Sequence, residues 1–271
     1  MSEEEPFEFI DQFGEVRRCG SWKVPENFVS SFNTFEGEFP LWTDAQIMQA
    51  LRDPGRRVTR KVLGPEWIPN QGPYSSCNGF AAANAYSRAR YFGGKRDGKI
   101  FSGSYVYAWV NGGRDAGSAL EDSLKEQGIH GNVLLSKCGP SMIYRSQTAQ
   151  FDAEAAQEKA VNAYAVQTMQ GLKTAGAAGF MLIVAIQVGR TWERLDSRGV
   201  SGVDSGGGNH AVCCDDYLLL PDGTPVFDCV MDWGISHGVK GKTYLTEAHF
   251  AQTIGRHQFY AIPTGQAGSG A

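Results

Sequence analysis

The spacing of hydrophobic positions changes near residue 180. Before that point, apolar and small residues recur at the i, i+3, i+4 and i+7 positions of a helical face, as at Ala82, Ala85, Tyr86 and Ala89. Beyond it, short β-rich apolar runs are separated by turn residues. A helical first half followed by a β-meander predicts an α+β fold with two lobes, because segregated helices and strands form separate packed layers.

Capping and stop signals in the first half predict five helices. The first follows Thr43 or Asp44 as its cap, and the fourth follows Ser118, with Glu121 three residues later as in a capping box. The expected ranges are 43–52, 77–91, 102–110, 118–127 and 153–171, of which the last is the longest.

Five strands are expected in the second half, over 180–188, 210–220, 225–233, 242–245 and 257–262. The Pro-Asp-Gly-Thr turn between the second and third strands predicts a hairpin. Cys213 and Cys214 are expected on opposite faces of the second strand, because successive side chains alternate along a strand. Asp215 and Asp216, which follow them, are expected at a bend in that strand.

The chain is expected to divide into an arm, one domain and a tail. Residues 1–60 carry charges, isolated aromatic residues and turn formers, which predicts an irregular arm with a single helix. The domain is expected over 61–265, with a helical lobe at about 70–175 and a β lobe at about 176–262. Residues 266–271 are expected to form a flexible tail.

Composition and charge exclude several classes of function. The chain has 271 residues and a net charge of −4, and no segment carries the basic stripe typical of nucleic-acid binding. The densest basic cluster, at positions 56, 57, 60 and 61, is expected in a solvated loop. The longest apolar run is too short to cross a bilayer, and the acidic N-terminus lacks the apolar core of a secretory signal. We therefore expect a cytoplasmic or otherwise intracellular protein that binds neither nucleic acid nor membrane.

The six cysteines, at positions 19, 77, 138, 213, 214 and 229, form no Cys-x-x-Cys pair and no Cys/His spacing typical of a metal site. No metal or cofactor is therefore expected. Cys213, Cys214 and Cys229 lie in apolar, strand-like runs, so we expect them to be buried. Reduced thiols are expected throughout, in keeping with an intracellular protein.

Cys77 is the strongest candidate for chemistry. It follows a turn rich in Gly, Pro and Ser and begins a predicted helix. A helix N-terminus and a nearby imidazolium both lower the pKa of a thiol, and only the thiolate is a good nucleophile. His210 begins a predicted strand and can supply the imidazole. The side-chain amide of Gln71, folded back by the turn, can bind an oxyanion together with the Cys77 backbone N–H.

Four segments resemble the papain-like cysteine peptidase family. QGPYSSC, residues 71–77, is similar to the active-site turn Gln-Gly-x-Cys-Gly-Ser-Cys-Trp, and NHAV, residues 209–212, is similar to the histidine segment. DWG, residues 232–234, resembles Asn-Ser-Trp-Gly, and NGGRDAGSAL, residues 111–120, resembles an Asn-Gly-Gly element. The separation of Cys77 and His210 also fits this family. The resemblance implies a papain-like two-lobe fold, with a helical N-terminal lobe, an antiparallel β-barrel-like C-terminal lobe and the site in the cleft between them.

The resemblance also implies a role for each matching residue. Cys77 would be the nucleophile, and His210 would be its base and then the acid for the leaving group. Gln71 would be the oxyanion donor. Trp233 would shield the partner of the histidine from water, and the backbone of Gly113 would bind an extended peptide. The implied activity is hydrolysis of a polypeptide substrate through an acyl-thioester, without a cofactor.

The chain departs from the family pattern at the residue that orients the histidine. Met231 occupies the place of the family's Asn, and Asp232 comes one residue later. Because successive strand residues face opposite sides, Asp232 can orient His210 only if the end of the strand bulges or slips in register. Otherwise the Cys-His pair works without a third member. Tyr-Ser at 74–75 and Asn78 also replace the family's Cys-Gly and Trp.

Three classes of function are compatible with these residues: a cysteine peptidase, a Cys-His amidase or acyltransferase, and a structural or interaction protein that keeps the fold with weak or no activity. The arm can serve as a lid, as a substitute for an inhibitory prosegment or as a tether for a protein partner. We expect an integral arm, because no helical prosegment pattern is present. The residues His130, His237, His249, His257, Glu121 and Asp122 are expected to face water.

Overall fold

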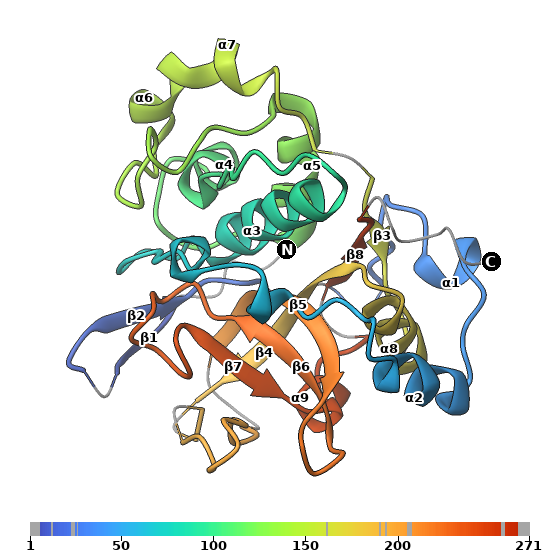
Figure 1. The fold of residues 1–271 in the computed structure, drawn as a ribbon. Coiled ribbons are helices and arrows are strands. Elements are labelled where there is room, and N and C mark those ends of the chain that lie inside the picture. Colours follow the sequence, from blue (N-terminus) through green and yellow to red (C-terminus); the bar gives the residue numbers. More distant parts are fainter. Residues whose placement is uncertain are drawn as a thin grey trace.

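The computed structural model describes residues 6–11, 13–22, 25, 27–160, 162–189, 191–192, 194–204, 208–255 and 258–264. A group of helices covers one face of a sheet, and further helices lie on its other side (Figure 1). The α-helices are α1 (Phe35–Glu38), α2 (Asp44–Arg52), α3 (Cys77–Phe92), α4 (Gly103–Val110), α5 (Leu120–His130), α6 (Arg145–Thr148), α7 (Asp152–Ala155), α8 (Met169–Ala177) and α9 (Glu247–Ala251). The short 3-10 helices are η1 (Thr59–Lys61), η2 (Pro65–Trp67) and η3 (Ala149–Phe151). The expected α+β fold is confirmed.

The β lobe contains a six-stranded antiparallel sheet with the order β3-β8-β4-β5-β6-β7. Its strands are β3 (Tyr164–Ala165), β4 (Met181–Val188), β5 (Gly208–Leu219), β6 (Pro225–Val230), β7 (Lys242–Leu245) and β8 (Phe259–Ile262). The expected strands are confirmed, although β6 ends three residues early and position 257 lies outside the described residues. Within the described part of the chain the sheet is open, so the expected barrel-like closure is not seen.

Strand β4 is buried on both faces from Met181 to Ile186, which explains the apolar run over these residues. Leu182 and Val184 belong to the larger hydrophobic cluster, which includes residues of α8. Ile183 belongs to a second cluster, which includes residues of α3. Strand β5 alternates in the same way, with Cys214 in the first cluster and Cys213 in the second, as expected. A register shift between Cys214 and Asp216 confirms the expected bend. The sheet is therefore sandwiched between two sets of helices.

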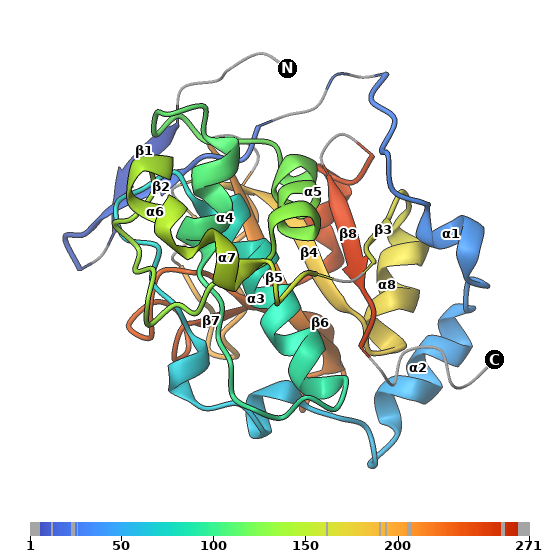
Figure 2. The same ribbon diagram turned by 90° about the horizontal axis from the view of Figure 1, so that it is seen from above.

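Helix α3 lies against β5 in both ribbon views (Figures 1 and 2). Two glycines allow α4 to approach it closely. A Cβ on Gly79 would lie 2.3 Å from the Gly103 carbonyl oxygen, and a Cβ on Gly103 would lie 2.4 Å from Phe80. Since no real Cβ tolerates such distances, the small residues near the start of α3 set the spacing of the helical lobe.

Four of the five expected helices are confirmed, as α2, α3, α4 and α5. Thr43 caps α2 through a capping box with Gln46, as its sequence predicts. The cap proposed at Ser118 is wrong, because α5 starts at Leu120 with Ala119 as its cap residue. The backbone of Ser118 instead pairs with the N-terminal arm.

The expected long helix over 153–171 is wrong. The short helix α7 ends at Ala155, and the chain then forms strand β3 before α8 begins at Met169. Tertiary pairing overrides local helix propensity here, because β3 pairs with β8 and the Val166 N–H donates to the Phe259 carbonyl. Thr168 then caps α8 by accepting from the Gly171 N–H.

The N-terminal region has more regular structure than its sequence predicts. Strands β1 (Phe7–Ile10) and β2 (Val16–Cys19) form a hairpin, and α1 and α2 follow. Phe35, Ile47 and Leu51 are buried in the larger cluster, so this stretch completes the core below the sheet. Its apolar residues are too widely spaced to show one period, since they belong to separate short elements. The expected tail at 266–271 lies outside the described residues.

The basic residues near position 57 do not form a solvated loop. The Arg56 guanidinium donates to the carbonyl oxygens of Gly176 and Tyr217, and Arg57 donates to that of Gly179. Both therefore tie the chain after α2 to the end of α8 and to β5. Carbonyl acceptors are invisible in a sequence, which explains why the charge pattern alone suggested solvent exposure.

Cys214 and Cys229 form a disulfide, so the expectation that all thiols are reduced is wrong. The two residues stand directly opposite each other on β5 and β6, where side chains of one face meet. Cys19, Cys77, Cys138 and Cys213 are free thiols. The disulfide removes one ground for the intracellular location, which remains a prediction. Among the described residues, no helix is both long and apolar enough to cross a membrane.

Removing this disulfide is expected to lower the free energy of unfolding by up to about 3 kcal/mol, because the link closes a loop of 15 residues in the unfolded chain. The measurement is urea unfolding of the wild type and of a Cys214→Ala/Cys229→Ala double variant. A Cys138→Ala variant controls for the loss of a buried sulfur outside the link. Equal stability of the double variant and the wild type would contradict the prediction.

Candidate active site

Cys77 is the first residue of α3 and is fully buried. The turn before it is held by Asp115, whose carboxylate accepts the Ser75 N–H at 2.8 Å and the Tyr107 hydroxyl at 3.0 Å. The turn glycine Gly72 has φ of 68°, a conformation that glycine adopts without strain. The cysteine therefore lies at a helix N-terminus, as predicted, at the end of a turn fixed to the helical lobe.

His210 lies near the start of β5 and is also fully buried. Its Nε2 lies 3.0 Å from the Met231 carbonyl oxygen, and its ring stacks on Trp233 at a centroid distance of 4.4 Å. Burial lowers the pKa of His210 to about 3, with the Met231 hydrogen bond opposing the shift and His237 adding to it. A neutral imidazole that donates from Nε2 leaves Nδ1 as a proton acceptor, and Nδ1 has no partner among the described residues.

The structure brings Cys77 to the strand that carries His210. The sulfur of Cys77 interacts with the backbone of Ala211, the residue after His210, and with the backbone of Gly20 in the N-terminal arm. Burial raises the pKa of the Cys77 thiol to about 11, and these backbone groups only partly offset it. With the arm in place, the pair is therefore a neutral thiol and a neutral imidazole.

Gln71 is fully buried in the turn before Cys77. Its Nε2 donates to the Tyr74 carbonyl oxygen at 2.7 Å and to the Arg18 carbonyl oxygen at 3.0 Å. Arg18 belongs to β2, so a peptide carbonyl of the arm lies on the amide that sequence reasoning assigned to an oxyanion. The position is suited to binding a carbonyl oxygen, and in this structure the chain itself occupies it.

Asp232 does not contact His210 through its side chain. Its carboxylate accepts from the Asn84 side-chain amide on α3, whereas the backbone carbonyl of Met231 accepts from the histidine. The chain turns after β6 with a φ of 61° at Asp232, and the hydrogen-bond partner of the carboxyl lies on α3. The structure therefore has the arrangement without a side-chain third member that the sequence left open.

Trp233 covers the imidazole of His210 with its face and is itself fully buried. Gly113, by contrast, lies in a turn where its N–H donates to the Asn111 side chain and where an added Cβ would meet nothing. Ser118 pairs through its backbone with Ser21 of the arm, and the substrate contact expected at Gly113 stays a prediction.

The N-terminal arm crosses the site between the two lobes. The Ser21 N–H donates to the Asn209 carbonyl in the β lobe at 3.2 Å, and the Trp22 N–H donates to the Ser118 carbonyl in the helical lobe at 2.9 Å. Ser118 returns a hydrogen bond to the Gly20 carbonyl. Figure 2 shows the arm passing from the β1–β2 hairpin, beside the helical lobe, to α1 on the opposite side of the molecule. Residues 18–22 therefore cover both Gln71 and Cys77.

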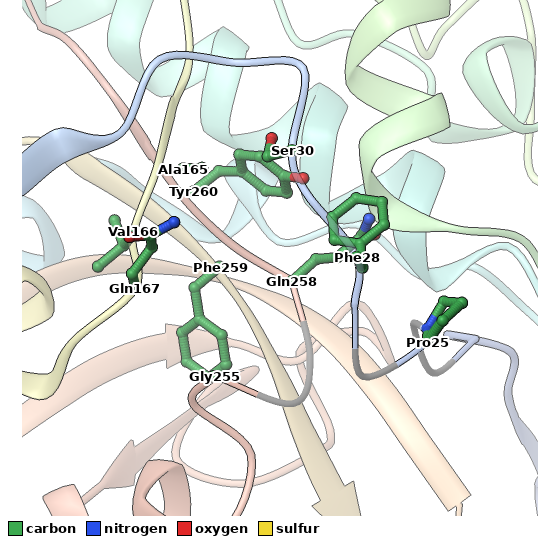
Figure 3. Close-up of a pocket in the computed structure, with 10 residues that line it drawn as sticks. All are labelled: Pro25, Phe28, Ser30, Ala165, Val166, Gln167, Gly255, Gln258, Phe259 and Tyr260. Carbon is green, nitrogen blue, oxygen red and sulfur yellow. The ribbon is translucent and has the colours of Figure 1, made fainter. Parts of the chain in front are cut away.

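Further along the arm, a cavity of about 200 Å³ separates it from the edge of the sheet. Phe28 and Ser30 of the arm line one side, and Val166, Phe259 and Tyr260 line the other (Figure 3). Neither Cys77 nor His210 lines this cavity.

Sequence reasoning missed three buried polar residues. His237 packs edge-on against Trp233, and His249 lies between the Thr246 N–H and the Gly202 carbonyl, so neither faces water. Glu121 is also buried, and it accepts from Ser30, Ser31 and Tyr260 as well as from Lys125. The only sequence signal for a buried Glu121 is the presence of its donors, the serines at 30–31 and Tyr260 of β8. These residues are far from Glu121 in the sequence, so the pairing could not be predicted. His130 stays half-exposed, where it pairs with Glu126.

Replacing Glu121 with glutamine is expected to reduce stability at neutral pH but not at pH 2. Burial alone would raise the pKa of Glu121, but hydrogen bonds from Lys125, Tyr260 and Ser30 outweigh it and lower the pKa to about 2. A depressed carboxyl stabilises the fold above its unfolded pKa and loses that contribution as pH falls toward 2, here about 3 kcal/mol. Urea unfolding at pH 7, 4 and 2 measures it, and a constant gap between wild type and Glu121→Gln would contradict it.

No protein-family model matches the sequence, and no curated protein matches it. Several experimentally determined structures do match. Xylellain, a cysteine protease from Xylella fastidiosa, has a TM-score of 0.66 at 18% identity, over 92% of this chain and 98% of xylellain. The proform of the ragweed pollen cysteine protease Amb a 11 has a TM-score of 0.62 at 19% identity, over 90% and 70% of the two chains. Procathepsin B from Trypanosoma congolense has a TM-score of 0.60 at 13% identity, over 90% and 86%.

These matches extend over most of this chain, and they agree with the order of a helical lobe that carries the cysteine and a β lobe that carries the histidine. The chain has the fold of the papain-like cysteine proteases.

Proposed function

We propose that the protein is a cysteine peptidase that cleaves peptide bonds through an acyl-thioester, with Cys77 as nucleophile and His210 as base. The observation that carries the proposal is the approach of the Cys77 thiol to the strand that bears the His210 imidazole. The sulfur of Cys77 lies against the residue that follows His210, and the imidazole is held by its Nε2, which leaves Nδ1 to exchange protons.

The proposed reaction uses that free nitrogen twice. His210 Nδ1 takes the Cys77 proton, and the sulfur attacks the substrate carbonyl carbon, whose oxygen receives hydrogen bonds from the Gln71 amide. The C–N bond then breaks, and the imidazolium returns the proton to the leaving amine. Water hydrolyses the thioester by the reverse sequence of proton transfers, which restores the thiol. In the covered state the Gln71 amide already donates to a peptide carbonyl oxygen, that of Arg18, which supports this role.

In this structure residues 18–22 cover the site, so the structure represents a state that cannot bind substrate. Residues 18–22 must move before a substrate carbonyl reaches Gln71, because the Arg18 carbonyl occupies the same donor. Two of the similar structures, Amb a 11 and procathepsin B, are proforms. We infer that the covered site is a latent form of this enzyme.

The test is incubation of the full chain with a diverse peptide library, followed by mass spectrometry of the products. New peptide ends with free carboxylates are the expected result once residues 18–22 are displaced, because the Arg18 carbonyl otherwise occupies the Gln71 amide. Products in which an acyl group has moved to another amine, with no free carboxylate, would favour an acyltransferase instead. Absence of any product, even after residues 18–22 have been displaced, would contradict the peptidase proposal.

A structural or interaction role is the second candidate, because two observations favour it. The thiol and imidazole are both neutral and buried, and the place of the orienting Asn is taken by Met231, whose side chain is buried in the core. This role would use the arm or the lobes to bind a protein partner. For a purely structural or interaction role, we expect no peptide cleavage from any variant of the arm. The product analysis described above tests this.

A further inference from the structure

Asp232 occupies an unusual backbone position directly after the strand that holds the histidine. Strand β6 ends at Val230, and the chain then turns with a φ of 61° at Asp232, whose side chain is fully buried. Residues other than glycine avoid this region of φ because Cβ crowds the backbone. Such a conformation persists only where surrounding contacts determine it, so the contacts of this one residue are informative.

Two of these contacts hold the backbone around the candidate dyad. The Asp232 carbonyl oxygen accepts the backbone N–H of Gln71 at 2.7 Å, which fixes the turn that bears the oxyanion donor. The preceding carbonyl, that of Met231, faces His210 Nε2 at 3.0 Å. The two successive carbonyls around the turn therefore serve two different parts of the site, and a change of φ or ψ here displaces both.

A third contact ties the turn to the helix of Cys77. The Asp232 carboxyl accepts from the side-chain amide of Asn84, which lies seven residues after Cys77 and on the same face of α3. The other end of that amide accepts from Arg88 Nη1 at 3.1 Å, and Arg88 Nε pairs with Asp215 of β5 at 2.7 Å. The chain of contacts thus runs from the turn through α3 to the strand that carries His210.

We propose that Asp232 is a positioning residue, whose buried side chain holds the Cys77 helix, the Gln71 turn and the Met231 carbonyl in one fixed arrangement. The inference rests on the proposed function, because it assigns the site a support in place of a side chain that touches the imidazole. Asp232 acts on His210 through the backbone of Met231 and does not contact the reacting atoms.

The neutral form of the carboxyl suits this role. Burial raises the pKa of Asp232 well above its usual range, although Arg88 and the Asn84 amide oppose the shift. One carboxyl oxygen serves Asn84, and the other has no partner within the described residues. An asparagine at position 232 keeps the acceptor that Asn84 needs and adds no charge, so it is the conservative replacement.

Glycine at position 232 separates the side chain from the backbone turn. Glycine adopts a φ of 61° freely, so Asp232→Gly removes only the carboxyl and its bond to Asn84. Asn84→Ala removes the other partner of the same bond and is a second route to the same loss. The matched control is Asn132→Ala, which removes a different buried amide whose nitrogen donates to the Glu158 carbonyl at 2.7 Å.

The primary readout is solvent exchange of the His210 Nε2 proton, followed by nitrogen-15 NMR of the full chain and assigned with a His210→Gln variant. Exchange is expected to become at least about tenfold faster in Asp232→Gly and in Asn84→Ala, because the Met231 carbonyl loses its fixed position. Asp232→Asn is expected to keep the slow exchange rate of the wild type. Asn132→Ala is also expected to leave the exchange rate unchanged. The double variant Asp232→Gly/Asn84→Ala is expected to be no faster than either single variant, since both remove one bond.

Wild-type exchange in a folded Asp232→Gly or Asn84→Ala protein would overturn the inference. So would an equal acceleration in Asn132→Ala, since that would be a general loss of stability. Where the chain cleaves peptides, kcat is expected to fall by about 10- to 100-fold in Asp232→Gly with KM unchanged, as for a misplaced reactive group. Absence of cleavage by the wild type contradicts the proposed function alone, because the exchange measurement does not depend on activity.

Discussion

With residues 18–22 displaced from the site, the chain is expected to cleave peptides and to be labelled by a thiol-reactive electrophile, and both activities are expected to disappear when Cys77 is replaced with alanine. Without the sulfur no acyl-thioester forms, and removal of the nucleophile from enzymes of this kind costs on the order of 10³-fold or more in kcat. The rest of the site is expected to survive, since alanine fits the helix and the small-residue cluster around Cys77.

The measurement is mass spectrometry of the labelled chain, together with a peptide-cleavage assay. Cys138→Ala is the matched control, because Cys138 is also fully buried and burial also raises the pKa of its thiol, yet it lies outside the site. Both activities are expected to be retained in that variant. Labelling that persists in Cys77→Ala, or cleavage that survives it, would exclude Cys77 as the nucleophile.

His210→Ala separates the two steps. An alkylating electrophile needs only a thiolate, so labelling of Cys77 is expected to slow, whereas peptide cleavage also needs proton delivery to the leaving amine and is expected to stop. The contrast between the two assays tests the base role of His210 Nδ1, which has no hydrogen-bond partner among the residues that the structure describes.

The sequence predicts the parts of the molecule whose signals are local. The turn before Cys77, the strand of His210 and the alternation of Cys213 and Cys214 all follow from neighbouring residues, and the structure confirms them. A cysteine at a helix start and a histidine at a strand start carry little information singly. Their order along the chain, shared with a known fold, made them a candidate pair.

Other features depend on partners that are distant along the chain. The direction of the Asp232 carboxyl depends on Asn84, 148 residues earlier, and no pattern around position 232 reveals that partner. The Cys214–Cys229 disulfide depends on the register of β5 and β6, which the apolar runs leave undefined by a residue or two. The helix expected over 153–171 failed for the same reason, since pairing with β8 decides that segment.

The N-terminal arm shows how one segment can contain two functional parts. From Phe35 onward it is part of the core, so the expectation of an integral arm fits this portion. Residues 18–22 instead bind by backbone hydrogen bonds across both lobes and bury a thiol and an amide that the proposed chemistry needs. If the covered site is a latent form, as proposed, we therefore expect the boundary between the displaceable and the permanent portion of the arm between these two stretches, well before residue 60.

Replacing Gly20 with alanine is expected to uncover the site in the full chain. A Cβ at this position would lie 2.5 Å from the Ser75 carbonyl oxygen, 2.7 Å from the Ser75 Cβ and 2.9 Å from the Gly117 Cα. All three neighbours are in the turn of Cys77 or in the backbone beside it, so none can yield as a flexible side chain would. The arm must lift, and Cys77 and Gln71 are then exposed to solvent.

The expected result is faster alkylation of Cys77 by iodoacetamide at pH 7. Burial in the covered state raises the pKa of the Cys77 thiol to about 11, although backbone contacts with Ala211 and Gly20 oppose the shift, so at pH 7 only about 10⁻⁴ of the molecules carry a thiolate. A solvated thiol with a pKa near 8.5 is about 3% ionised, so exposure alone predicts a gain on the order of 100-fold. The pH profile is also expected to shift, because alkylation of the covered thiol keeps rising toward pH 11 whereas that of the uncovered thiol levels off earlier.

Gly139→Ala is the control for this experiment, since a Cβ there meets no atom within 4 Å and the residue does not have a positive φ. Its alkylation rate is expected to match that of the wild type. A Gly20→Ala protein that is folded, yet alkylated no faster than Gly139→Ala, would mean that the arm does not control access to the thiol. A gain in alkylation without any gain in peptide cleavage would confirm that the arm covers Cys77. The same result would favour a binding role over a peptidase for the site beneath the arm.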